Sequence, residues 1–250
     1  MRIVAVIPAR MGSSRFPGKP IKPILGVPMI EHVYRRTTMC PEITQTFIAT
    51  CDHEIKVAAE EFGAPVIMTS SQHERASDRV AEASEKIEGD VLVLVQGDEP
   101  LTNPQAISAA IKPFLHRESV GCVNLMKRII DYTEFHSANV IKVIVDKRGN
   151  ALFMSRQPIP TNENGLSEVF AYKQVCIIPF SRRALQEYKT LPPTPYEIAE
   201  SIDMMRFIEH GISVQMIETE FESYAVDVPE DIGRVERVMH SDPLVSHYLN

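Results

Sequence analysis

Residues 8–20 concentrate side chains that could bind a polyphosphate. They read PARMGSSRFPGKP and directly follow the apolar run IVAVI at residues 3–7. Cations neutralise phosphate charge, glycines let backbone N–H groups approach an anion closely, and serine hydroxyls are small donors. The residues of these kinds are Arg10, Arg15, Lys19, Gly12, Gly18, Ser13 and Ser14. The alternative is a solvated basic loop, but the pattern favours an enzyme that handles a nucleoside triphosphate. Its spacing differs from that of the glycine-rich phosphate loop of ordinary ATPases.

Two acidic positions further along the chain are candidate metal ligands. Asp98 lies in QGDEP at residues 96–100, directly after VLVLV at residues 91–95, and Asp227 lies in AVDVPED at residues 225–231. Their carboxylates suit Mg²⁺, a hard cation that prefers oxygen. Each also has a structural alternative, because Gly-Asp-Pro favours a turn and an aspartate before a helix is a common cap. Together with the cationic loop, two separated carboxylates match the charge neutralisation that phosphoryl or nucleotidyl transfer requires.

A lone arginine, Arg156, follows a segment that we expect to form a hairpin. As a bidentate clamp it would suit a substrate carboxylate. Taken by itself, however, a single arginine of this kind is more often a surface residue, and the residue type alone favours that interpretation.

The overall composition excludes several classes of protein. The chain has 250 residues, of which 44% are hydrophobic and 24% charged, and its formal net charge of −7 argues against a general nucleic-acid binder. Its four cysteines form no CxxC pair and its eight histidines show no HxxxH or HxH spacing, which disfavours a zinc site. The initial apolar run is too short for a signal peptide or a membrane span. We therefore expect a cytoplasmic protein without membrane insertion.

Apolar runs and helical patterns alternate along the first half of the chain. Strands are predicted over residues 2–7, 46–50, 65–68 and 90–95, with helices over residues 28–36 and 53–62 and others beginning near residues 77 and 104. This order is typical of a parallel, doubly wound α/β sheet, in which ligands bind at the carboxyl ends of the strands. Residues 8–20 and 96–100 both follow such ends.

The second half has a mixed pattern. Residues 139–145 and 151–154 flank the turn sequence DKRG, which predicts an antiparallel hairpin. A strand is expected over residues 175–180, and a single helix over residues 194–210. We expect one α/β domain over residues 1–250.

Motifs along essentially the whole chain resemble those of the CMP-Kdo synthetases, the 3-deoxy-manno-octulosonate cytidylyltransferases. The segments that carry the resemblance are IPAR and SRFPGKP (residues 7–20), GVPMI (26–30), VQGDEP (95–100), VIVD (143–146), ALFMSR (151–156), IP (159–160) and VDVPED (226–231). The first motif is shared with sialic-acid cytidylyltransferases and so specifies the superfamily, while QGDEP and the Ser-Arg pair narrow the resemblance to the Kdo branch.

The resemblance implies a fold and a reaction. The fold would be a Rossmann-like nucleotidyltransferase with a doubly wound, mixed but mostly parallel sheet. A small antiparallel subregion over about residues 151–216 would serve dimerisation and acceptor binding, in a homodimer. The reaction would be Mg²⁺-dependent: CTP and a 2-keto-3-deoxy sugar acid give a CMP-sugar and diphosphate, by in-line attack of the anomeric hydroxyl on the α-phosphorus. Lipopolysaccharide or capsule synthesis would use the product.

The resemblance also implies roles for individual residues. Arg10, Arg15 and Lys19 would bind the triphosphate, and Asp98 and Asp227 would hold the metal; four of these, Arg10, Lys19, Asp98 and Asp227, would be the catalytic groups. Nucleotide contacts would further come from Pro8, Ala9, Ser13, Ser77 and Arg79. The acceptor would meet Gln96, Arg156, Gln174 and Met204.

The chain departs from the family pattern at three places. HERASDR at residues 73–79 replaces a His-x-Ser-Gly-Thr-Asp/Glu-Arg motif, QVCII at residues 174–178 replaces HLGIY, and DMMR at residues 203–206 replaces EQLR. Because a site built for particular hydroxyls discriminates strongly when their partners change, another acidic acceptor such as an amino-Kdo or a nonulosonate is an alternative. A catalytically silent nucleotide-binding paralogue and a sugar-1-phosphate nucleotidyltransferase are weaker alternatives.

Overall fold

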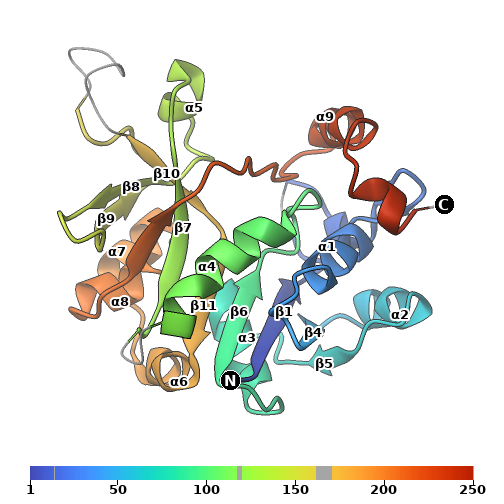
Figure 1. The fold of residues 1–250 in the computed structure, drawn as a ribbon, viewed down its shortest axis with the longest axis horizontal. Coiled ribbons are helices and arrows are strands. Elements are labelled where there is room, and N and C mark those ends of the chain that lie inside the picture. The colour runs from blue at the N-terminus through green and yellow to red at the C-terminus, as the bar shows by residue number, and fades with distance from the viewer. Residues whose placement is uncertain (14, 117–119, 162–170, 250) are drawn as a thin grey trace. The chain divides into compact units, whose positions relative to one another are not determined.

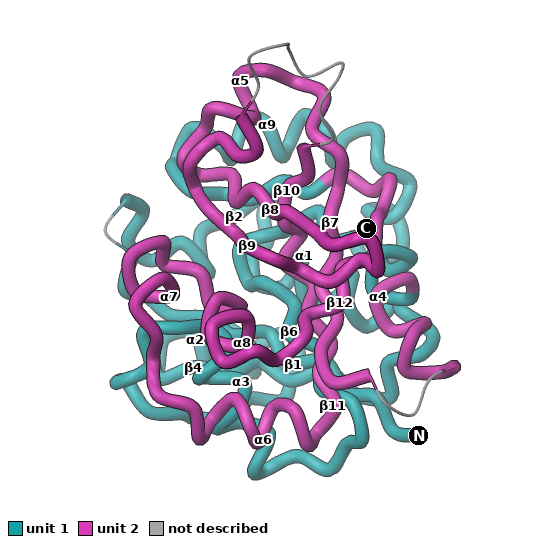
Figure 2. The backbone as a smooth tube through the Cα atoms, turned by 90° about the vertical axis from the view of Figure 1, so that its left-hand side faces the viewer, with its two compact units in different colours: residues 1–108, 223–250 teal, residues 109–222 magenta. Residues whose placement is uncertain are grey.

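The computed structural model describes residues 1–13, 15–116, 120–161 and 171–249 (Figure 1). Ser14 of the cationic loop lies outside the described residues. The chain divides into two compact units, which Figure 2 colours separately. Unit 1 comprises residues 1–108 and 223–250, and unit 2 comprises residues 109–222.

Unit 1 is built on strands in the order β6-β1-β4-β5, which are parallel as the sequence predicted. Their bounds are β1 Ile3–Ala9, β4 Gln45–Thr50, β5 Val66–Met68 and β6 Val91–Val95. The central strand β1 pairs with β4 on one side and with β6 on the other. Every residue of β1 and β6 is buried, which explains why both strands read as unbroken apolar runs.

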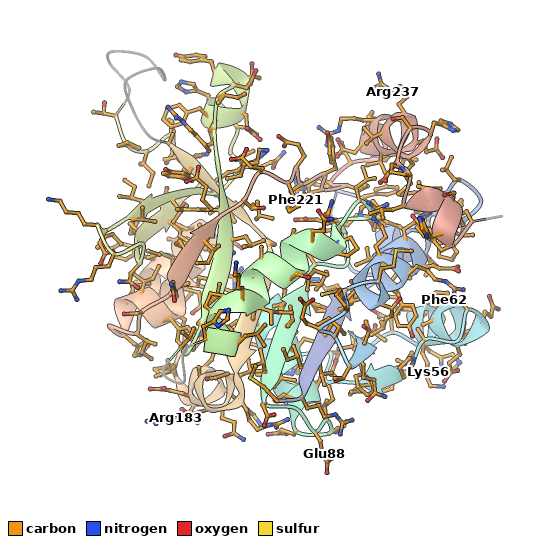
Figure 3. All side chains as sticks on the ribbon, viewed as in Figure 1. Lys56, Phe62, Glu88, Arg183, Phe221 and Arg237 are labelled. Carbon is orange, nitrogen blue, oxygen red and sulfur yellow. The ribbon has the colours of Figure 1, made fainter. Side chains whose placement is uncertain are left out.

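Helices α1 (Met29–Thr38), α2 (His53–Glu61) and α3 (Ala76–Ser84) pack on these strands. Short elements complete the unit: 3-10 helix η1 (Lys19–Ile21), hairpin strands β2 (Pro23–Ile24) and β3 (Val27–Pro28), helix α9 (Glu230–Met239) and 3-10 helix η2 (Val245–His247). Phe62, labelled in Figure 3, follows α2 and contacts Tyr34 of α1, with their ring centroids 5.7 Å apart. The labelled Lys56 pairs with Glu60 on the outer side of α2.

One apolar cluster in unit 1 joins loops that are distant in sequence. It contains Phe16 from the cationic loop, Ile24, Met29, Leu101, Val226, Val235 and Met239. Leu101 follows QGDEP and Val226 precedes Asp227. Burial of this cluster therefore brings the three loops that carry the candidate chemistry to the carboxyl-end edge of β1 and β6.

Unit 2 contains a mixed sheet in the order β12-β7-β10-β8-β9. The strands are β7 Val123–Arg128, β8 Lys142–Val145, β9 Ala151–Ser155, β10 Tyr172–Val175 and β12 Gln215–Glu218, with β11 at Ile177–Ser181. Pairs β7–β10, β10–β8 and β8–β9 are antiparallel, which confirms the predicted hairpin, whereas β12 runs parallel to β7. The helices are α5 Tyr132–His136, α6 Arg182–Thr190, α7 Pro195–Glu200 and α8 Met205–Glu209; helix α4 (Pro104–His116) crosses the unit boundary in sequence.

Two predicted elements of unit 2 are each divided in the structure. The helix expected over residues 194–210 is two helices, because Ser201 adopts a left-handed conformation (φ 57°) that ends α7. A buried ion pair between Arg206 of α8 and Glu197 of α7 then joins the two short helices, at 2.6 Å. The strand expected over residues 175–180 likewise breaks at Cys176, between β10 and β11.

Gly97 supplies the first prediction, because it lies where two backbones approach closely. A Cβ at this position would lie 2.7 Å from the Pro8 carbonyl oxygen and 3.2 Å from Cδ1 of Ile30. Gly97→Ala should therefore lower the free energy of unfolding in urea by about 2 kcal/mol. Gly233→Ala in α9 is the control, because nothing lies within 4 Å of its added Cβ, and it should raise stability by about 0.5–1 kcal/mol. Wild-type stability in Gly97→Ala would contradict the packing argument.

His32 supplies the second prediction. Its ring is fully buried; Nε2–H donates to the Ile24 carbonyl at 2.8 Å, and the Tyr248 hydroxyl donates to Nδ1 at 3.0 Å. Burial lowers the pKa of His32 below its ordinary value of 6.5. Its contribution to stability is thus complete above pH 6.5 and is lost as pH falls through the folded-state pKa.

The test of His32 compares melting temperatures at about pH 7.5 and about pH 5. The melting temperature of wild type should fall more on acidification than that of His32→Gln, because the glutamine amide can keep both hydrogen bonds without taking up a proton. Equal losses in the two proteins would show that His32 does not carry this pH dependence.

Candidate charge cluster at the carboxyl end of the sheet

Lys19 joins two of the loops in unit 1. Its ammonium donates to Oδ2 of Asp98 at 2.7 Å and to the Val226 carbonyl at 2.7 Å, and it lies 4.0 Å from Oδ1 of Asp227. The side chain is 12% exposed. It begins η1 directly after Gly18, whose left-handed backbone (φ 71°) turns the chain at this point. A backbone bond from Val226 N–H to the Asp98 carbonyl, at 2.9 Å, links the same two loops.

Arg15 pairs with the second carboxylate. Its Nη2 donates to Oδ1 of Asp227 at 2.9 Å. Asp227 does not cap α9 through its side chain, which was the structural alternative. Instead, Asp231 accepts from the backbone N–H groups of Asp227 and Val228, at 2.8 and 3.0 Å. Asp231 therefore holds the backbone of the loop and leaves the Asp227 carboxylate to the charge cluster.

We call Arg15, Lys19, Asp98 and Asp227 the charge cluster. The structure brings these four predicted residues together within unit 1. Among the described residues, no group of three or more His, Cys, Asp and Glu side chains is arranged to hold a metal. Two carboxylates near one another suit Mg²⁺ all the same, because Mg²⁺ keeps several waters and takes further oxygen ligands from substrate phosphates. The donor set thus fits the predicted metal.

The first part of the cationic loop is positioned by a residue that the sequence analysis missed. Asp52, directly after β4 and before α2, accepts from Met11 N–H at 2.7 Å. Pro8 and Ala9 are buried at the end of β1, and Arg10 is exposed just beyond them. The Ser13 hydroxyl accepts from Phe16 N–H at 3.1 Å. Ser13 therefore stabilises the conformation of the loop. The sequence feature that could have identified Asp52 is its position directly after β4, a strand that is parallel to β1 and next to it.

Ser77 and Arg79 lie inside unit 1. Both side chains are buried, and Arg79 donates to the Thr69 hydroxyl and to the Ser70 carbonyl. His73 of the same segment contacts Glu82, which also accepts from Ser70 N–H at 2.9 Å. These bonds tie residues 69–75 to α3. Arg79 therefore supports this segment, and direct contact of Ser77 and Arg79 with a nucleotide stays a prediction.

Arg156 is held in unit 2 by backbone carbonyls. Its Nε, Nη1 and Nη2 donate to the carbonyls of Glu200, Ala138 and Ser201, at 2.8, 3.0 and 3.4 Å. Lys142, which the sequence analysis missed, is fully buried and donates to the Arg156 carbonyl among others. Burial lowers the pKa of Lys142 to about 8, and the charge of Arg156 acts in the same direction. The guanidinium of Arg156 is thus held in place by backbone carbonyls, unlike that of an ordinary surface arginine.

The other predicted acceptor residues have different surroundings. Gln96 is partly buried directly after β6 in unit 1. Gln174, in unit 2, donates through Nε2 to Oδ1 of the buried Asn124 at 2.5 Å. Met204 is fully buried in unit 2, with its sulfur 3.8 Å from that of Cys122. The Met204 side chain thus has no exposed surface in this structure, and its contact with an acceptor stays a prediction. That Gln96, Arg156 and Gln174 line one site stays a prediction.

A family model described as cytidylyltransferase matches residues 4–220 of the chain. The chain belongs to the cytidylyltransferase family. Among the described residues, none of the helices combines the length and apolar character needed to cross a membrane.

Curated relatives of this cytidylyltransferase are named 3-deoxy-manno-octulosonate cytidylyltransferase. One from Solibacter usitatus is 41% identical over 243 residues, which cover 97% of this chain and 96% of the relative. One from Geobacter metallireducens is 39% identical over 245 residues, covering 94% and 96%.

Solved structures confirm the predicted nucleotidyltransferase fold. A structure of CMP:2-keto-3-deoxy-manno-octonic acid synthetase complexed with CTP matches with a TM-score of 0.89 and 34% identity, covering 96% of this chain and 99% of that one. A 4-diphosphocytidyl-2C-methyl-D-erythritol synthase from Anaerococcus prevotii, 14% identical with a TM-score of 0.63, shares the fold alone.

Proposed function

We propose that this cytidylyltransferase transfers CMP from CTP to 3-deoxy-manno-octulosonate and releases diphosphate, in a Mg²⁺-dependent reaction of lipopolysaccharide synthesis. The observation that carries the proposal is the charge cluster, in which two carboxylates and two cations from three loops meet at one edge of the sheet. The names of the relatives and the CTP complex of a similar synthetase support it.

The proposed roles follow from charge. Asp98 and Asp227 would hold Mg²⁺, which would neutralise charge on the phosphates next to the bond that breaks. Arg10, Arg15 and Lys19 would bind the triphosphate, with cytidine against the backbone of Pro8 and Ala9. The anomeric oxygen would form a bond to the α-phosphorus as the bond to the diphosphate oxygen breaks. The hydroxyl proton would pass to solvent water, and the electron pair would leave with the diphosphate. Lys19 and Arg15 would stabilise that charge.

The acceptor side of the proposal rests on unit 2. Arg156 is fixed through three backbone carbonyls, which suits a residue that must present its remaining N–H groups to a substrate carboxylate. We further propose a cytoplasmic homodimer, with residues 151–216 as the subregion for dimerisation and acceptor binding. Large exposed apolar side chains at Leu152, Tyr196 and Ile198 support that role for these residues.

A second candidate acceptor is another acidic sugar, such as an amino-Kdo or a nonulosonate. Two observations favour it. The amide of Gln174 donates to Asn124, and Met204 is buried, at positions where the family resemblance implies polar groups that face sugar hydroxyls. Fewer polar groups toward the sugar would change which hydroxyls the site accepts.

The carboxylates generate the prediction for catalysis. Asp98→Asn and Asp227→Asn should each lower the turnover of diphosphate release from CTP by at least about a thousandfold, because charge neutralisation at the phosphates is lost. Asp90→Asn is the matched control, since Asp90 is exposed at the opposite, amino end of β6, and it should keep wild-type turnover. A protein that releases no diphosphate with any acceptor would instead be a silent nucleotide binder.

The acceptor is tested separately with wild-type protein. CTP and Mg²⁺ are combined with Kdo, an 8-amino analogue or a nonulosonate, and kcat/KM is measured from diphosphate release. We expect Kdo to be the best acceptor. A preference for another acid by about tenfold or more, equal to about 1.4 kcal/mol of transition-state stabilisation, would establish the second candidate and reject the first.

A further inference from the structure

The charge cluster is already neutral in the free protein. Arg15 lies 2.9 Å from Asp227, and Lys19 lies 2.7 Å from Asp98 and 4.0 Å from Asp227. Two negative side chains therefore face two positive ones. A divalent cation bound by the same two carboxylates would meet these cations at short range and be repelled by them.

The two cations differ in how freely they can leave. The Lys19 side chain is 12% exposed and is tied to the Val226 carbonyl as well as to Asp98. The Arg15 side chain is 50% exposed, and its long chain can swing towards solvent. Arg15 is therefore the cation that can exchange partners, while Lys19 stays in place.

A triphosphate supplies the partner for that exchange. Its oxygens compete with Asp227 for the guanidinium of Arg15, because Arg binds phosphate and carboxylate with the same paired N–H geometry. When Arg15 moves to the phosphates, Asp227 loses the nearer of its two cations and can bind a metal more readily. Binding of the triphosphate and of the metal would then be coupled even before the two touch each other.

We propose that Arg15 is an ion-exchange residue: it pairs with Asp227 in the free protein and is released by a triphosphate, so that a divalent cation binds more tightly once the triphosphate is bound. The proposal deepens the proposed function, on which it rests only for the identity of the two ligands. Because Arg15 would pair either with Asp227 or with the phosphates, its removal should change the binding of each ligand measured alone.

The first test measures Mn²⁺, as a paramagnetic probe, binding to the nucleotide-free protein. Arg15→Gln should bind Mn²⁺ about fivefold more tightly than wild type, the size expected for loss of one partly exposed ion pair. Lys22→Gln is the matched control, because it removes one positive charge from an exposed side chain of the same segment, and it should stay within about twofold of wild type. Binding by Arg15→Gln that equals or falls below that of the control, including no detectable binding, would overturn the proposal.

The second test measures inorganic triphosphate without any divalent cation. Asp227→Asn should tighten this binding, because Arg15 no longer has to leave a carboxylate. In the Arg15→Gln background the same change should lose most of its effect, since the residue that carries the coupling is absent. Additive effects of the two substitutions would show that Asp227 acts only through general repulsion, and would overturn the proposal.

Both tests are independent of catalysis. If no sugar acid supports diphosphate release, the proposed function fails, but the two binding measurements still show whether Arg15 exchanges Asp227 for a triphosphate. If Arg15→Gln and its control bind Mn²⁺ equally but wild type turns over Kdo, the exchange fails and the proposed function stands. Thermal unfolding of each variant, with a midpoint close to that of wild type, shows that the compared proteins are folded.

Discussion

The ammonium group of Lys19 is the contact on which the arrangement of the candidate site depends. It donates at the same distance, 2.7 Å, to a carboxylate after β6 and to a backbone carbonyl before α9. These two loops lie far apart in the chain, and only the fold of unit 1 brings them together. A mostly buried ammonium requires several acceptors, because it loses water that would otherwise solvate it. The need to satisfy Lys19 therefore constrains where Asp98 and Asp227 can lie.

Charges of this kind do not hold a fold together by themselves. Partly exposed ion pairs contribute little net stability, because desolvation and side-chain ordering offset most of the attraction. The apolar cluster that contains Phe16, Leu101 and Val226 provides the larger favourable free energy, and each of these residues is close in sequence to a member of the charge cluster. The sequence thus places an apolar anchor beside each charged group. Burial of the anchors positions the charges, and the charges are then available for ligands.

Local patterns predicted those parts of the fold and site that depend on neighbouring residues. The unbroken apolar runs of β1 and β6 indicated a parallel sheet, and hence that residues 8–20 and 96–100 meet at one edge. Long-range contacts were not predictable in this way. Nothing near Asp52 in sequence shows that it accepts from Met11, and nothing near Arg79 shows that its guanidinium turns inward. Likewise, nothing near Ser201 in sequence shows that the helix ends there, or that Glu197 and Arg206 form a buried pair once the chain has folded back.

The division of the chain into two units separates two kinds of chemistry. All four members of the charge cluster belong to unit 1, whereas Arg156, Gln174 and Met204 belong to unit 2. Two of the three departures from the family pattern, at residues 174–178 and 203–206, also fall in unit 2. Because Lys19 and its hydrogen-bond partners all belong to unit 1, substitutions at residues 174–178 and 203–206 can alter the contacts offered to an acceptor without removing any of those partners. One chain can therefore keep the charge cluster that would act on the nucleotide while it changes the residues that would contact the acceptor.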